Sequence, residues 1–555
     1  MSTRTLPTVR RVSLADLHAF PDLFVDVANR RDAALRLYDG DWKDVEVRRE
    51  KAKAAAAQPA DRDVLADALM EHNALWSDAG AVPDAVRANI DALRDESSVA
   101  VVTGQQVGFL SGPLYTIYKT ITTLQLAEEI AADTGRPVIP VFWVEGEDHD
   151  FEEIARASVF HRNDVVDLEY PTDPDKARSR ANVGPVGRLT LDERIDDLLD
   201  RLDDALPPSD FKPDVMASLR DAYCQGTRIE DAFARLIRHL FEGTGLVLMN
   251  PDDARLKRLV TPLFRKDLTD GAEAVEAVQT AGAHLEEAGY HAQVHASPTN
   301  LFLLDDGGRL PIDVDEDGGF RLRGTERRFS RDQLLERLEA EPEAFSPNVV
   351  LRPLMQDALL PTVAYVAGPG EVSYFAQYRD VYDWAGLTMP LIHPRASVSV
   401  VESKVRSVME DFDLSVADLT GDMEQLFQQI VVQHMEVDID AVFGEALAQI
   451  HGAINDLKPS VEEVDRTLVK SAEAARAAIA QEIDELKQRV VRAEKRQHDE
   501  LRAKLEKARV NLVPGGLQER RINVHYFLNK YSPDLLDDLR QVLSTDTSAH
   551  QVVEL

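Results

Sequence analysis

Cysteine is almost absent from this chain of 555 residues, in which Cys224 is the only one. A single thiol can form neither a disulfide within the chain nor a thiolate metal cluster, which suits a reducing cytosol. No His or cationic residue stands beside Cys224 in the sequence to activate it, so we interpret it as a small packing side chain. Any thiol chemistry is therefore expected to involve a thiol of the substrate.

Long apolar runs are also missing. No run reaches the roughly 18 residues that a membrane span needs, and residues 1–20 lack the apolar stretch of a secretion signal. Basic residues are outnumbered, with 63 Lys and Arg against 98 Asp and Glu, for a net charge of −35. Such a surface repels phosphate backbones and anionic lipids. We expect a cytoplasmic, salt-adapted acidic protein with no nucleic-acid or membrane partner.

Three common site motifs are absent as well. The glycines do not spell G-x-G-x-x-G, no Gly-Lys-Ser/Thr occurs in a phosphate-binding loop, and H-E-x-x-H is missing. These absences argue against a dinucleotide site, a Walker loop and a zinc protease. The composition, 44% hydrophobic and 29% charged, is that of a globular protein, and the length suggests two to four domains.

Apolar periodicity divides the chain into regions. Residues 1–95 show helical spacing and are expected to pack on a core formed by residues 96–400. In that core, short apolar runs alternate with helical segments, which predicts a Rossmann-like, doubly wound parallel α/β sheet. Insertions are expected at about 155–245 and 285–330, the second as a β-meander with Asp/Gly turns. The expected strands are Val99–Val102, Pro137–Val144, Leu246–Met249, Val349–Leu351, Thr362–Val366 and Met389–Ile392.

Residues 401–516 are predicted to form an all-α coiled-coil domain, and 517–555 a helical segment that returns to the core. A long helix at about 461–510 has an imperfect heptad pattern. This pattern fits an antiparallel pairing within the chain or the arm of a homodimer, and a solvated charged helix is the simpler alternative.

The first candidate segment, Thr103–Pro113, follows the first strand and contains Gly104, Gln105, Gln106 and Gly112. Glycines before a helix let its free N–H groups approach an anion, and Lys119 lies two turns into that helix. An anion site and a structural turn are equally good interpretations.

The second segment, residues 145–153, crowds carboxylates around one histidine at the end of an apolar strand. Glu147, Asp148 and His149 are candidates for proton transfer or for holding Mg²⁺. The alternative is a helix N-terminus with acidic residues that favour its dipole. No metal-ligand set is assigned.

The third group of candidates lies near the later strands and comprises Arg352, Gln356, Gly368, Gly370, Glu371 and Arg395. Arg352 and Arg395 offer guanidinium groups for carboxylate or phosphate, and Gly-Pro-Gly precedes a helix. Because ligands of open α/β sheets bind at the carboxyl ends of strands, we expect Gln105, His149 and Arg352 to face one cleft.

These stretches resemble the cysteine-adding enzymes of bacillithiol biosynthesis. The similar stretches are VTGQQVGFLSGPLYTIYK at 102–119, PVFWVEGEDHDFEE at 140–153, VLRPL at 350–354, AGPGEVSY at 367–374, Pro394–Arg395 and FLNKY at 527–531. The resemblance covers nearly the whole chain and brings Tyr115 into the candidate set. It implies a ligase that joins cysteine to the amine of glucosaminyl-malate, with a coiled coil used for dimerisation.

Amide formation from a free carboxylate in water needs an activated acyl group, so ATP-dependent adenylation of cysteine, with Mg²⁺, is the mechanism expected. The glycine segments would then cradle phosphate, and Arg352, Arg395 or Lys119 would neutralise its charge. Two other functions remain open: another nucleotide-dependent transferase or dehydrogenase on the same sheet, and a non-catalytic coiled-coil scaffold.

Overall fold

The structure, a computed structural model, describes residues 6–171, 184–295, 297–305, 307–315, 317–434 and 438–555. The chain forms two compact units, one of residues 1–401 with 514–555 and one of residues 402–513. None of the helices in the described ranges combines the length and apolar character that a membrane crossing requires.

A five-stranded parallel sheet is the centre of the first unit, in the order β13-β12-β2-β3-β6. Its strands are β2 (Val99–Gln106), β3 (Val138–Glu145), β6 (Val247–Met249), β12 (Thr362–Ala367) and β13 (Leu391–Pro394). The chain adds β3 and β6 on one side of β2 and then returns to add β12 and β13 on the other. This reversal between β2 and β12 is the switch point of a Rossmann-like sheet, so the predicted fold class is confirmed.

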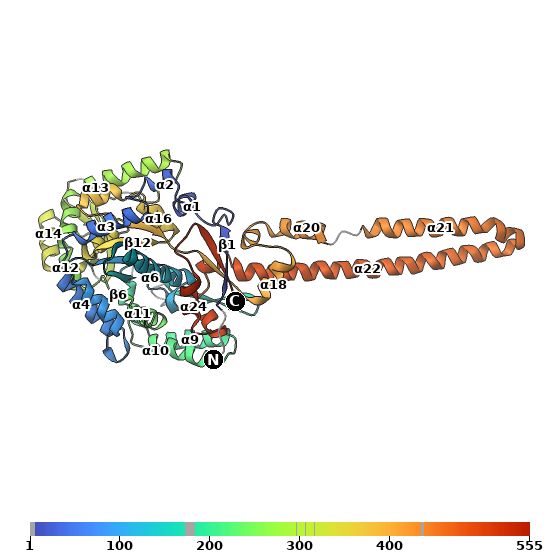
Figure 1. Cartoon of the computed structure of the whole chain (residues 1–555), viewed down its shortest axis with the longest axis horizontal. Coiled ribbons are helices and arrows are strands. Elements are labelled where there is room, and N and C mark those ends of the chain that lie inside the picture. The colour runs from blue at the N-terminus through green and yellow to red at the C-terminus, as the bar shows by residue number, and fades with distance from the viewer. Residues whose placement is uncertain (1–5, 172–183, 296, 306, 316, 435–437) are drawn as a thin grey trace. The chain divides into compact units, whose positions relative to one another are not determined.

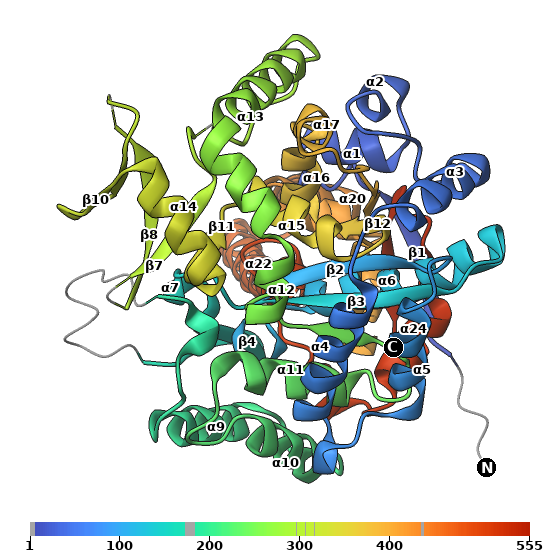
Figure 2. The same ribbon diagram turned by 90° about the vertical axis from the view of Figure 1, so that its left-hand side faces the viewer.

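Helices cover both faces of this sheet, because its strands are apolar on both sides. Along β3, Val141 and Trp143 belong to one buried cluster and Phe142 and Val144 to the other. Figure 2 shows α16 and α17 on one side of the β2–β3 pair and α9, α10 and α11 on the other. The bounds are α6 (Leu114–Thr134), α9 (Arg194–Ala205), α10 (Lys212–Ala222), α11 (Ile229–Leu240), α16 (Pro369–Phe375) and α17 (Arg379–Ala385). The remaining helices of this unit are α1 (Asp22–Ala28), α2 (Asp32–Leu35), α3 (Val45–Ala56), α4 (Arg62–Leu75), α5 (Asp84–Leu93), α7 (Phe151–Ile154), α12 (Ala254–Leu259), α13 (Thr261–Glu287), α14 (Arg331–Ala340), α15 (Leu351–Leu359), α23 (His525–Lys530) and α24 (Leu535–Val542).

Antiparallel strands accompany the main sheet. The meander expected near 285–330 forms a sheet in the order β10-β9-β8-β7-β11. Its strands are β7 (Leu301–Asp305), β8 (Gly308–Val314), β9 (Phe320–Leu322), β10 (Arg328–Phe329) and β11 (Phe345–Pro347). A hairpin, β4 (Arg156–His161) with β5 (Asp164–Glu169), opens the earlier insertion.

The prediction is wrong for three parts of the chain: Val349–Leu351, the N-terminal region and the C-terminal region. Val349–Leu351 is not a strand but leads into α15, because the Asn348 side chain accepts the N–H groups of Val350 and Leu351 and starts a helix there. The terminal regions are not purely helical, since β1 (Thr8–Ser13) pairs with β15 (Ala549–Glu554) beside β14 (Val398–Val401). Each terminal strand needs a partner more than 500 residues away, which local patterns do not reveal.

The second unit contains α18 (Ser403–Asp411), α19 (Val416–Thr420), α20 (Met423–His434), α21 (Ile439–Val464) and α22 (Val469–Leu512). Figure 1 shows α21 running beside α22. The pairing is antiparallel, because Lys458 bonds Glu473 near the turn and Lys487 bonds Asp440 further along. The long helix expected from 461 therefore begins at Val469, after Asp465 leaves helical geometry and bonds Thr467.

Candidate functional site

A cavity of about 810 Å³ lies at the carboxyl edge of the parallel sheet. The ends of β2 and β3 reach it at Gln106 and Glu145, which pair in register, and the residues just after β12 and β13 also line it. Gln105, His149 and Arg352 all face this one cavity, although they come from distant parts of the sequence. The candidate residues in its wall are Gly104, Gln105, Gln106, Tyr115, Lys119, Asp148, His149, Arg352, Gly368, Gly370, Glu371 and Arg395.

Four of the candidate residues do not line the cavity. The Thr103 hydroxyl donates to the Val366 carbonyl oxygen at 3.0 Å, and Gly112 is not in the wall of this cavity. The Gln356 side chain is buried and donates to Asp357 at 2.9 Å. Glu147 is 2% exposed and points to Lys257. The Glu147–Asp148–His149 group is thus split: Glu147 turns into the protein, whereas Asp148 and His149 face the cavity.

The glycines of the glycine-rich segment allow close packing of the backbone in this structure. Thr103–Gln106 belong to β2 itself, and a Cβ at Gly104 would lie 3.1 Å from Cβ of Trp143. Gly108 and Gly112 approach each other so closely that a Cβ at Gly108 would lie 3.1 Å from Cα of Gly112. The first N–H group of α6, that of Leu114, donates to the Ile522 carbonyl oxygen at 2.8 Å. The structural-turn interpretation therefore fits this segment better than an anion site.

Lys119, which is buried, and Glu371, which is partly buried, form an ion pair in the cavity wall at 2.6 Å. Lys119 also donates to the Gly104 carbonyl oxygen, while Glu371 accepts from the Tyr365 hydroxyl at 2.6 Å and from the Gly368 N–H at 2.5 Å. Burial raises the pKa of Glu371, but Lys119 and these donors outweigh it and hold the pKa below its ordinary value. The charge of Lys119 is thus balanced within the protein.

Arg395 is balanced in the same way. Its Nη2 donates to Glu519 at 2.7 Å, and both side chains are almost fully buried. Glu519 also accepts from the Val398 N–H at 2.7 Å and from the Ser397 hydroxyl at 3.2 Å, so three groups donate to it. Tyr115 lies under this guanidinium, 5.6 Å from ring centroid to Cζ. The charge of Arg395 is therefore neutralised by Glu519 and attracts an anionic ligand only weakly.

Arg352 differs from the other cations of the wall. Its guanidinium bonds only neutral groups, Gln356 Oε1 at 3.3 Å and the Tyr374 hydroxyl at 3.5 Å. It lies 5.9 Å from the ring centroid of Trp143 and 5.7 Å from that of Tyr365. Within the described parts of the chain, no carboxylate lies at ion-pair distance from Arg352. A guanidinium so placed has its N–H groups available for an anion.

Acidic groups and a histidine also line the cavity. Asp148 accepts from Gln106 at 2.7 Å and lies 3.3 Å from His149 Nδ1. Burial raises the pKa of Asp148, but His149, Arg309 and Gln106 outweigh it and hold the pKa well below its usual range. Glu153 differs, because burial raises its pKa above the ordinary value. The site therefore has a charged Asp148 beside His149 and a carboxyl that ionises less readily.

Sequence reasoning missed several residues of the wall. Arg309, from β8, bonds Ser346 at 2.9 Å and the Pro347 carbonyl oxygen at 2.7 Å, and its Nη1 lies 3.3 Å from His149 Nδ1. A basic residue in a meander carries no local signal of this placement. The other wall residues outside the candidate set are Trp143, Glu145, Glu153, Gln293, Phe302, Pro347, Asn348, Val349, Tyr365, Pro369, Tyr374 and Arg520. Trp143, Glu145, Glu153 and Tyr374 lie in the stretches that carry the family resemblance.

Among the described residues, no three His, Cys, Asp or Glu side chains are placed to bind one metal ion. Protein side chains alone therefore do not form a metal site there. The carboxylates that face the cavity are Glu145, Asp148, Glu153 and Glu371. Mg²⁺ often binds through one or two carboxylates together with substrate phosphates, and such a shared ion fits this wall.

The fold and the cavity define a class of protein: a Rossmann-like α/β enzyme with an appended helical hairpin. A family model described as bacillithiol biosynthesis BshC, N-terminal Rossmann-like domain, matches residues 9–396, and that of the C-terminal coiled-coil domain matches residues 398–555. The chain therefore belongs to the bacillithiol biosynthesis BshC family, as the resemblance in the sequence indicated.

Similar proteins cover the whole chain. A protein of Salinibacter ruber named "Putative cysteine ligase BshC" is 62% identical over 554 residues, which is 100% of both chains. Proteins with the same name are 34% identical in Chloroherpeton thalassium, over 97% of both chains, and 35% identical in Chlorobaculum tepidum, over 89% of both chains.

Proposed function

We propose that this protein is a carbon–nitrogen ligase that joins cysteine to the amine of glucosaminyl-malate to form bacillithiol, after ATP-dependent activation of the cysteine carboxylate. Family membership and the names of the relatives support cysteine ligation. The observation that carries the proposal is the cavity with Arg352, which has no carboxylate partner among the described residues, facing a wall that contains Asp148 and His149.

The cavity wall contains both cationic and acidic groups, which suit the two kinds of group that the reaction brings together. Arg352, or Arg520 elsewhere in the wall, would bind the carboxylates of the malate group or the phosphates of a nucleotide. ATP fits these guanidinium groups better than the glycine segment, where the N–H groups of Val107, Gly108, Gly112 and Leu114 already donate to protein carbonyl oxygens. Mg²⁺ would be held on the phosphates, with Asp148 or Glu145 as protein ligand.

His149 is the residue that we propose as the proton acceptor for the attacking amine. Asp148 can only accept a hydrogen bond, so a hydrogen on Nδ1 of His149 directed at Asp148 leaves Nε2 free to take the proton. Arg309, which can only donate, lies at the same distance of 3.3 Å from Nδ1 and competes with this arrangement. Binding of an anion near Arg309 would favour the basic form of Nε2.

The test is to incubate purified protein with ATP, Mg²⁺, cysteine and glucosaminyl-malate and to detect bacillithiol by mass. The assay is run at low and at high salt, because the net charge of −35 makes low-salt inactivity uninformative. Wild-type protein should form product, whereas omission of ATP should abolish it. His149→Ala should lower kcat by about 100-fold or more. Failure of the wild type under every salt condition would refute the ligase, and full activity of His149→Ala would refute only the assignment of the base.

A further inference from the structure

Lys257 is a buried cation that the proposed reaction does not use directly. It lies in α12, is 0% exposed, and bonds the carboxylate of Glu147, which is 2% exposed. The two residues are 110 positions apart in the sequence. A buried ion pair loses the hydration of both charges, so its presence calls for a structural or functional reason.

The position of this ion pair suggests such a reason. Glu147 is followed directly by Asp148 and His149, which face the cavity. The same short segment is tied down at two further points, since Gly187 N–H donates to the Gly146 carbonyl oxygen at 2.8 Å and Val186 N–H to that of Asp148 at 2.7 Å. Residues 146–148 are therefore each bonded to a residue that does not line the cavity.

Lys257 also connects this segment to β11. Its Nζ donates to the Phe345 carbonyl oxygen at 2.9 Å, and the next two residues of β11, Ser346 and Pro347, bind Arg309. Arg309 Nη1 in turn lies 3.3 Å from His149 Nδ1. Strand β11 thus bonds two cations. Lys257 contacts the segment through Glu147, and Arg309 contacts His149.

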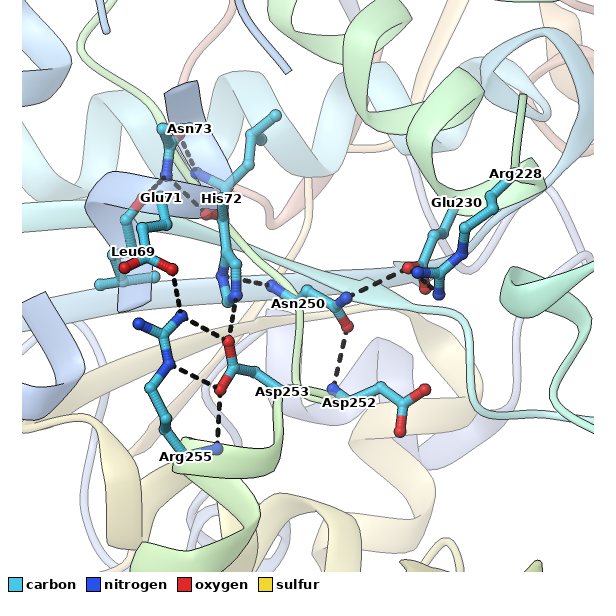
Figure 3. A network of polar contacts seen from close by, with 11 residues as sticks. Leu69, Glu71, His72, Asn73, Arg228, Glu230, Asn250, Asp252, Asp253 and Arg255 are labelled. Carbon is cyan, nitrogen blue, oxygen red and sulfur yellow. Dashed lines mark hydrogen bonds and ion pairs between the residues drawn. The ribbon is translucent and has the colours of Figure 1, made fainter. Parts of the chain in front are cut away.

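The start of α12 is itself fixed by the polar network in Figure 3. Asp253 caps the helix by accepting from the Arg255 N–H at 2.8 Å, and its other oxygen contacts His72 Nε2 at 2.9 Å. The Asn250 backbone N–H can only donate, so His72 Nδ1, at 3.3 Å, accepts and Nε2 carries the hydrogen. This network sets the first turn of α12, and Lys257 N–H donates to the Asp253 carbonyl oxygen at 2.9 Å one turn later.

Glu230 lies between this polar network and residues 145–150. Its Oε1 accepts from Asn250 Nδ2 at 3.1 Å, and Arg228 bonds the same oxygen. Its Oε2 would lie only 3.0 Å from a Cβ at Gly146 and 2.8 Å from one at Gly187. Glycine is therefore needed at both positions for the segment to pass over this carboxyl group.

We propose that Lys257, through Glu147, is a positioning residue that holds residues 145–150 so that Asp148 and His149 face the reacting groups. This inference rests on the proposed ligase function for its effect on rate, but not for its effect on the segment. Displacement of a reacting group by about 1 Å can cost about 100-fold in rate, and loss of outer partners of catalytic groups typically costs about 10–100-fold.

The test uses the double variant Lys257→Met/Glu147→Gln, which removes both charges and leaves no buried ion unpaired. A control is Arg48→Met/Asp133→Asn, which removes a partly buried ion pair, at 2.7 Å, outside the cavity wall; Arg48 also contacts the more exposed Glu129 at 3.4 Å. Each variant is assayed for kcat and for KM of both substrates, and hydrogen–deuterium exchange is followed in the peptide that covers residues 145–150. Thermal unfolding establishes that each variant is folded.

Lys257→Met/Glu147→Gln should lower kcat by about 10–100-fold with KM changed by less than about threefold, and should speed exchange at 145–150. The control should retain kcat within about twofold and leave exchange at 145–150 unchanged. Unchanged exchange at 145–150, unchanged kcat, or an equal effect of the control would overturn the inference. If the wild type forms no product, the proposed function fails, and the exchange measurement alone decides whether Lys257 holds the segment.

Discussion

Replacement of Arg352 by Met tests whether the guanidinium that lacks a carboxylate partner binds substrate. Its contacts with Gln356 and Tyr374 are long, at 3.3 and 3.5 Å, so the folded protein should lose little, less than about 1 kcal/mol. A hydrogen bond to a charged substrate group is worth about 1.5–3 kcal/mol. The variant should therefore lose about 10–150-fold in kcat/KM while its melting temperature stays nearly unchanged.

The assay measures kcat/KM for glucosaminyl-malate, for cysteine and for ATP separately, with the other two substrates saturating. A loss confined to one substrate identifies which anion Arg352 binds. Arg352→Lys keeps the charge but loses the planar pair of donors, so it should fall between Met and wild type. Retention of kcat/KM within about twofold for all three substrates in Arg352→Met would refute the reasoning.

Arg395 gives a contrast for the same measurement. Its replacement by Met would leave Glu519, which is 0% exposed, without its cation. Breaking a buried pair in this way typically costs about 3–5 kcal/mol. Arg395→Met should therefore unfold at markedly lower urea than Arg352→Met, and equal midpoints would show that the two guanidinium groups do not differ as described.

The remaining predictions concern stability and are read from urea unfolding. Gly104→Ala should destabilise by about 1–3 kcal/mol, because its Cβ would meet Trp143 at 3.1 Å, whereas Gly370→Ala, with nothing within 4 Å, should be tolerated; similar values for both would contradict the packing role. Burial raises the pKa of Glu230 to about 8, so this carboxyl binds its proton more tightly in the folded than in the unfolded chain. Its contribution is present at low pH and is lost as pH rises through about 8. Glu230→Gln should thus gain stability relative to wild type between pH 5 and pH 8, by at most about 5 kcal/mol, and a pH-independent difference would refute the assignment.

Sequence reasoning predicted the central sheet because its strands are local, continuous apolar runs, as Val99–Val102 and Val138–Val144 show. It also predicted that three polar segments meet, since carboxyl ends of parallel strands lie at one edge. It failed at Val349–Leu351, where a short apolar run fits a strand and a helix equally well. The side chain of Asn348 decides between them.

The sequence by itself determined the fold class, the family and three of the segments that line the cavity, since these depend on local pattern and motif. Only the tertiary structure decided which charges remain available in the cavity. Lys119 and Arg395 are balanced by Glu371 and Glu519, while Arg352 has no such partner among the described residues. Glu147 turns inward to Lys257, and Arg309 arrives beside His149 from the meander. The physical reason is that charge balance depends on distances of a few ångströms between residues that lie more than 100 positions apart in the chain.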